Sequence, residues 1–192
     1  MAILKIARMG HPVLGRRAEA VPDPTHPQIQ GLVKDMIETM ADAVGTGLAA
    51  PQVHVPLRIM VFFVSEERAT DDDGDVEVPL TTLINPQVEP IGGDIASDWE
   101  GCLSLPGLTG LVPRFTRVRY SGFTLEGERI DRVASGFHAR VVQHEFDHLE
   151  GILYPMRMTD LSRLGFVQEV ARARAESMQS TSAREDDADV GP

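Results

Sequence analysis

The stretch His144-Glu145-Phe146-Asp147-His148 decides how the rest of this chain is interpreted, because it fits the pattern H-E-x-x-H. Residues four apart on a helix lie on the same face, so the two imidazoles can hold one metal ion. Glu145 is then close enough to take a proton from a water bound to that ion. Phe137 and Val141 fall on the same stripe of a helix that the sequence predicts from about residue 137 to 149.

Two histidines do not complete a catalytic metal site, which needs a third protein ligand and an open position. One candidate is a glutamate further along the chain, Glu169 or Glu176, as in zinc endopeptidases. The other is Cys102, the only cysteine in the chain. A thiolate with two imidazoles suits iron(II), cobalt, nickel or zinc. Taken by themselves, the residues leave both ligand sets open.

The net charge of −11 comes almost entirely from two segments of the 192-residue chain. The stretch 65–77 holds seven acidic residues and one basic residue, and the stretch 176–192 holds five and one. The remainder is nearly neutral, so no basic surface of the kind that binds DNA is expected. No apolar stretch is long enough to span a membrane, and the first residues do not resemble a signal peptide, so we expect a cytoplasmic protein without a membrane partner.

Apolar periodicity predicts two further helices and a strand-rich middle. The predicted helices cover Thr25 to Val44, which is amphipathic, and Leu161 to Ala175. The predicted strands cover Arg58 to Val64, Val78 to Ile84, Val112 to Thr124 and Arg129 to Ala134. Residues 1–175 are expected to form one catalytic domain. Residues 176–192 are expected to be an acidic, disordered tail, because they contain too few apolar residues to fold alone.

Three motifs in a fixed order make the chain resemble the peptide deformylases. They are G-x-G-L-A-A-x-Q from Gly45 to Gln52, E-G-C-x-S from Glu100 to Ser104, and Q-H-E-x-D-H from Gln143 to His148. The resemblance covers roughly Leu4 to Met158. Together with the strand-rich middle, it implies an α+β fold of mostly antiparallel sheets packed around a central metal-binding helix, with an N-terminal amphipathic helix and a C-terminal helix.

The resemblance implies a role for each residue of the site. Cys102, His144 and His148 would bind the metal, in place of a ligand set that contains a downstream glutamate. The metal would lower the pKa of its water and yield hydroxide, and Glu145 would act as the general base and later as the general acid. Gln52 and the backbone N–H of Leu103 would stabilise the oxyanion.

The resemblance also indicates where a substrate binds. Gly45 and Gly47 would let the substrate backbone approach closely, in the manner of an added strand. Phe137 and Val141 are candidates for the pocket of the substrate's methionine side chain, and ordinary core packing explains them equally well. Glu100 is expected to tie its motif to the rest of the site, whereas Asp147 points away from the ligand stripe, and Trp99 and Arg114 receive no role.

The implied function is a metal-dependent hydrolase that removes the formyl group from the N-terminal formyl-methionine of newly made polypeptides. The implied cofactor is one divalent metal ion, Fe²⁺ by family precedent, with Zn²⁺, Ni²⁺ and Co²⁺ as alternatives. The implied partners are N-formyl-methionyl nascent peptides, and the ribosome is a candidate. Two other functions remain open: a zinc endopeptidase that uses Glu169 or Glu176, and an inactive homologue that binds peptides.

Overall fold

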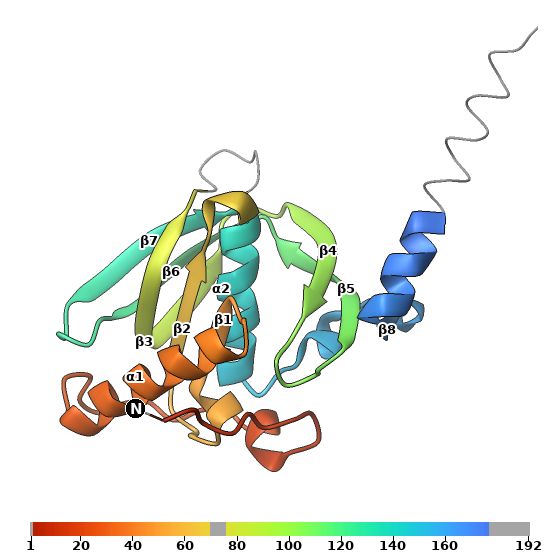
Figure 1. Cartoon of the computed structure of the whole chain (residues 1–192). Coiled ribbons are helices and arrows are strands. Elements are labelled where there is room, and N and C mark those ends of the chain that lie inside the picture. The colour runs from red at the N-terminus through yellow and green to blue at the C-terminus, as the bar shows by residue number, and fades with distance from the viewer. Residues whose placement is uncertain (1, 70–75, 177–192) are drawn as a thin grey trace, which may run out of the picture.

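A central helix, α2 (Gly136–Leu149), lies between two sheets in the computed structural model, which describes residues 2–69 and 76–176 (Figure 1). Within these residues one sheet has the strand order β1-β2-β3-β6-β7 and the other the order β4-β5-β8. The first contains β1 (Gly47–Ala49), β2 (Ile59–Val64), β3 (Val78–Pro90), β6 (Arg117–Phe123) and β7 (Arg129–Ser135). The second contains β4 (Ile95–Gly101), β5 (Leu108–Phe115) and β8 (Leu164–Phe166). All strand pairs are antiparallel, so the predicted α+β fold around a central helix is confirmed.

Strand β2 is almost fully buried because a helix covers each of its faces. Met60, Phe62 and Val64 pack in a cluster with α2, whereas Ile59 and Val61 pack in a second cluster with α1 (Pro27–Asp42). Successive side chains of a strand point to opposite faces, so burial on both sides requires the continuous apolar run that the sequence shows. The strand predicted at 58–64 and the helix predicted at 25–44 are present, with ends that shift by no more than two residues.

The strand predicted from Val112 to Thr124 is wrong as a single element, because it joins parts of two strands in different sheets. Strand β5 ends at Phe115, β6 begins at Arg117, and the chain bends between them. Each half alternates well enough to be a strand, and the choice of sheet depends on partners that are distant in sequence. Strand β4, whose sequence has no clear alternation, was not predicted, although it leads directly to Cys102.

Strand β3 continues past the point where its end was predicted. Asn85 adopts a positive φ of 51°, and the register against the neighbouring strand shifts between Ile84 and Gln87. The Asn85 side chain exchanges hydrogen bonds of 2.8 and 2.9 Å with the backbone of Val21. The Asn-Pro pair, which resembles a turn in sequence, therefore produces a bulge within a strand that runs to Pro90.

The C-terminal helix begins later than predicted. Leu161–Arg163 form a 3-10 turn, Leu164–Phe166 form β8, which pairs with β5, and the helix occupies residues 167–176. Pairing with a strand some 55 residues earlier overrides the local helical pattern. The tail predicted at 176–192 lies outside the described residues beyond residue 176, as do residues 70–75 of the acidic stretch. Among the described residues, no helix combines the length and apolar character needed to cross a membrane.

Candidate functional site

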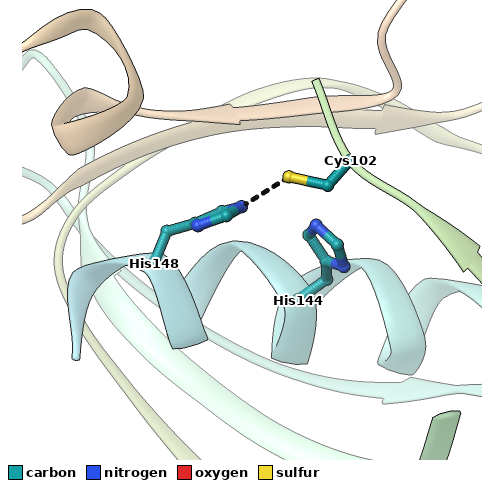
Figure 2. A group of neighbouring side chains, drawn as sticks. All are labelled: Cys102, His144 and His148. Carbon is teal, nitrogen blue, oxygen red and sulfur yellow. Dashed lines mark hydrogen bonds between the residues drawn. The ribbon is translucent and has the colours of Figure 1, made fainter. Parts of the chain in front are cut away.

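The side chains of Cys102, His144 and His148 point toward one another (Figure 2). Each offers one ligand atom, and these three atoms lie within 4.8 Å of one another. Both histidines project from α2, with ring centroids 5.1 Å apart, and Nε2 of His148 is 3.3 Å from Sγ of Cys102. The cysteine follows β4 directly, so the second sheet carries one candidate ligand to the helix that carries the other two.

The charges of this cluster favour the ligand form of the cysteine in the protein without bound metal. Burial by itself would raise the pKa of Cys102, but the nearby His148 and His144 lower it well below its ordinary value of 9.0. Burial would likewise lower the pKa of His144, but hydrogen bonds with Cys102 and Glu100 raise it well above 6.5. The thiolate is the form that binds metals, so the lowered pKa favours the form of Cys102 that can bind a cation.

Glu100 orients His144 from behind. Its Oε2 lies 2.8 Å from Nδ1 of His144, which leaves Nε2 as the nitrogen available to a cation. Arg114 donates two bonds of 2.9 Å to the same carboxylate, and Arg140 donates another of 2.8 Å. Burial would raise the pKa of Glu100, but the bonds from Arg114 and His144 hold it well below its ordinary range. The carboxylate is therefore charged when it accepts a hydrogen bond from the N–H of the His144 ring.

Arg114 connects this carboxylate to a second one on α2. Its Nη1 donates to Asp147 over 2.5 Å, and Asp147 also accepts two bonds from Arg157. Glu100, Arg114 and Asp147 are each no more than 5% exposed, so the network ties β4, β5 and α2 together beneath the candidate ligands. The expectation that Glu100 ties its motif to the site agrees with these contacts, whereas the sequence assigned no role to Arg114 and missed Arg140.

A sequence signal did exist for Arg140 but not for Arg114. Arg140 precedes His144 by four residues, so the helical pattern places both on one face. Arg114 lies in a predicted strand whose partner strands the sequence does not reveal. Its position opposite α2 therefore depends on the tertiary fold. Gln143, the first residue of the third motif, bonds both the backbone N–H and the carbonyl of Phe115 and so fixes α2 to β5.

Gln52 presents its amide N–H₂ group to the cluster. The backbone N–H of Ala49 donates to its Oε1 over 2.8 Å, which settles the orientation of the amide. Its Nε2 then lies 3.2 Å from Oγ of Ser104 and 3.5 Å from Sγ of Cys102. Gln52 is 1% exposed, so this donor is held in place by the fold. Ser104, the last residue of the second motif, received no role from the sequence and is one of the partners of Gln52.

Glu145 lies fully inside the site, with one oxygen that has no hydrogen-bond partner among the described residues. Burial raises the pKa of this carboxyl above its ordinary value of 4.5, although the neighbouring histidines act in the opposite direction. The backbone of Gly47 packs against it: a Cβ on Gly47 would lie 2.7 Å from Cγ of Glu145. The physical need for glycine here is thus the approach of Glu145, rather than only the approach of a substrate.

A cleft of about 410 Å³ opens beside the cluster. It is lined by the predicted site residues Gly45, Gly47, Gln52, Cys102, Leu103, Phe137, Val141, His144 and Glu145. Phe137 and Val141 also contact the core cluster around α2, so both interpretations of these residues agree with the structure. Strands β1 and β4, each at the edge of its sheet, border the cleft from opposite sides.

The donor set fits a divalent cation, because one thiolate and two imidazoles form a common ligand set for iron(II), cobalt, nickel and zinc. Among the described residues no other group of three such side chains lies together. Glu169 and Glu176 lie on the exposed helix beyond β8 and do not belong to this group. The structure therefore gives no support to the zinc endopeptidase alternative.

Known proteins resemble this chain over most of its length. Residues 3–164 match the family described as polypeptide deformylase. A peptide deformylase of Ralstonia nicotianae is 50% identical over 86% of this chain and 93% of that protein. One from Bordetella bronchiseptica is 51% identical over 85% of this chain and 92% of that protein.

Solved structures agree with the sequence relatives. The peptide deformylase of Ehrlichia chaffeensis superimposes with a TM-score of 0.78 at 30% identity, over 95% of this chain and 99% of that one. The Met-Ala-Ser complex of a class I type b peptide deformylase from Acinetobacter baumannii gives a TM-score of 0.74 at 32% identity, over 82% of this chain and 99% of that one.

Proposed function

This chain belongs to the polypeptide deformylase family, and from that premise we propose how its residues remove the formyl group from the N-terminal formyl-methionine of new polypeptides. The observation that carries the proposal is the convergence of three ligand atoms from Cys102, His144 and His148 within 4.8 Å, beside the buried Glu145. These three residues hold the metal ion. The inactive-homologue alternative has no support, because the three candidate ligands lie together and Gln52, Leu103 and Glu145 line the adjoining cleft.

A divalent cation bound to these ligands supplies a Lewis acid that makes water nucleophilic near neutral pH. Glu145 takes the proton of the attacking water, because its Oε2 has no other partner among the described residues. The same carboxyl then holds that proton and passes it to the leaving amine of methionine. The formyl C–N bond breaks, and formate and a free N-terminus are released.

Gln52 and Leu103 stabilise the negative charge that develops on the formyl oxygen. The Gln52 amide is already oriented by Ala49, so its N–H₂ group needs no reorganisation during the reaction. The backbone N–H of Leu103 follows the cysteine directly and borders the same cleft. Two such fixed donors are the usual composition of an oxyanion hole.

The substrate backbone binds as an extended strand between β1 and β4. Both are edge strands, and their unpaired backbone groups can hydrogen-bond a peptide. The Met-Ala-Ser complex of the Acinetobacter baumannii relative supports a peptide of this kind. Phe137 and Val141 contact the methionine side chain from α2, and Gly45 and Gly47 border the peptide backbone.

The metal is proposed to be Fe²⁺, with Zn²⁺, Ni²⁺ and Co²⁺ as competitors for the same ligands. A thiolate beside iron is open to oxidation, so the metal must be identified in protein purified without oxygen. Elemental analysis of such protein, together with formate release, distinguishes the metals. The ribosome as a partner, a cytoplasmic location and a single catalytic domain over residues 1–175 stay predictions; co-sedimentation with ribosomes tests the first.

The proposed function is tested by formate release from a formyl-methionyl peptide. Metal-loaded protein should release one formate for each peptide and leave a free N-terminal methionine. Protein that contains one equivalent of metal and releases no formate would contradict the proposal.

A further inference from the structure

A second hollow opens beside the cleft, and Trp99 lines both. This hollow has a volume of about 530 Å³ and lies between Trp99 of β4 and the C-terminal segment that follows residue 161. Val167, the first residue of the C-terminal helix, also borders the cleft, and its N–H donates to the carbonyl of Gly107 over 2.9 Å. The C-terminal segment is therefore anchored at the cleft and bounds both spaces.

Two arginines give this hollow a positive charge. The guanidinium groups of Arg163 and Arg174 lie 5.7 and 5.8 Å from the ring centroid of Trp99. Among the described residues, no carboxylate lines the hollow and neither arginine forms an ion pair. Asp160 lies near Arg163, but its carboxylate accepts the N–H of Ser162. In a chain of net charge −11, such a cationic surface selects for an anionic ligand.

The geometry of β4 indicates which part of a substrate reaches the hollow. Trp99 and Glu100 are neighbours in a strand, so their side chains point to opposite faces. Glu100 points to α2, where Phe137 and Val141 receive the methionine, and Trp99 therefore points away from the methionine pocket. In an extended peptide, the side chains of the second and fourth residues point away from that pocket, because residues alternate.

Distance selects the fourth residue. Trp99 precedes Cys102 by three residues, and three residues of strand span about 10 Å. A peptide whose methionine lies beside Cys102 covers the same distance between its first and its fourth residue. Both the alternation and the distance therefore place the fourth side chain over Trp99.

We propose that Trp99, Arg163 and Arg174 form a subsite that binds an acidic side chain at the fourth residue of the formylated peptide. This inference rests on the proposed function and adds a preference among its substrates. A peptide is favoured over a nucleic acid as the occupant because Trp99 lines both the hollow and the peptide cleft.

The test compares kcat/KM for C-terminally amidated formyl-Met-Ala-Ala-Xaa peptides in which Xaa is Asp, Ala or Lys. At low salt we expect Asp to exceed Ala by about two- to fivefold and Lys to fall below Ala, with both differences reduced at high salt. Moving Asp to the third residue should remove the gain, because that side chain faces the methionine pocket. Trp99 is the only tryptophan, so the intrinsic fluorescence of the protein reports on this hollow. The amidated product peptide Met-Ala-Ala-Asp should change that fluorescence more than the amidated peptide Met-Ala-Ala-Ala does.

Variants assign the preference to the two arginines. Replacing both (Arg163→Gln with Arg174→Gln) should bring the Asp-to-Ala ratio to about 1. Arg172→Gln is the matched control: Arg172 lies on the same helix but pairs with Glu176 over 3.1 Å, so the ratio should keep its wild-type value.

Three outcomes have different meanings. If no peptide releases formate, the proposed function fails. If all peptides release formate at equal rates, only the subsite is wrong. If the double variant keeps the wild-type ratio but loses co-sedimentation with ribosomes, the arginines bind RNA instead of peptide, and the inference is overturned.

Discussion

At the scale of single residues, Glu145 is only 5% exposed, and one of its oxygens has no hydrogen-bond partner among the described residues. Both features suit its proposed role in proton transfer. Burial raises the pKa of this carboxyl above its ordinary value of 4.5, so it holds a proton more readily than an exposed glutamate does. His144 and His148 are proposed to bind the metal with Cys102, and Glu145 is not one of the proposed ligands. Proton transfer and metal binding can therefore be separated by substitution.

Glu145→Gln should keep the metal and lower kcat by about 10²- to 10⁴-fold, because glutamine has nearly the same shape but accepts no proton. Metal content and formate release, measured on the same preparation, check this. Activity within a few-fold of the wild type would show that another group moves the proton.

Cys102→Ala should lose the metal and, with it, the activity, because only two imidazoles remain. The peptidase alternative makes the opposite prediction, since its ligands would be His144, His148 and a downstream glutamate. Metal content after dialysis against a weak chelator distinguishes the two, and Glu169→Gln serves as the matched control that should retain metal.

At the scale of elements, the site depends on how closely β1 and β4 approach α2. Gly47 of β1 lies against the side chain of Glu145, and Glu100 of β4 lies against His144. These are contacts between segments about 100 and 44 residues apart in sequence, so the packing of whole elements positions the groups that are proposed to react.

Gly47→Ala should lower kcat by about 10²-fold with little loss of metal, because its Cβ would displace Glu145 from the reacting position. Formate release and metal content check this prediction. Gly93→Ala is the matched control, because a Cβ at Gly93 would meet no atom within 4 Å. Unchanged kcat in Gly47→Ala would mean that Glu145 shifts without consequence.

Arg114→Met should lower the free energy of unfolding by about 3–5 kcal/mol, because it leaves the buried carboxylates Glu100 and Asp147 without their shared partner. Urea unfolding measures the loss. Arg119→Met offers the comparison: its ion pair with Asp131 is exposed, so little change is expected. Equal losses in both variants would contradict the role assigned to the buried network.

At the scale of the whole molecule, buried charge connects stability to pH. Glu100 has a pKa held well below its ordinary value of 4.5 in the folded protein, so the unfolded chain binds this proton first as the pH falls. The stabilisation by Glu100 is therefore complete above pH 4.5 and is lost progressively as the pH falls below it.

Urea unfolding between pH 7 and pH 3 should show this loss. The free energy of unfolding should fall more steeply with decreasing pH below 4.5 than above it. Glu100→Gln should be less stable at pH 7 and should show a weaker dependence on pH over the same range. A wild-type stability that rises on acidification would contradict the assignment of a charged, hydrogen-bonded Glu100.

The sequence by itself determined the parts of this protein that depend on local order. Helix periodicity placed His144, Glu145 and His148 on one side of α2, apolar runs located β2 and α1, and the motif order indicated Cys102 and Gln52. The conclusions about the helices and about β2 rest on spacing within one segment, which the chain geometry fixes wherever the segment lies. The assignment of Cys102 and Gln52 rests on the resemblance of the three motifs to a known family.

Only the tertiary structure decided the features that depend on pairing between distant segments. The division of residues 112–124 between two sheets, the replacement of a helical start by β8, and the burial of Arg114 between Glu100 and Asp147 all depend on partners far away in sequence. The space beside Gly47 is filled by Glu145 for the same reason. Strand partners and buried ion pairs are chosen by global packing, which no local pattern encodes.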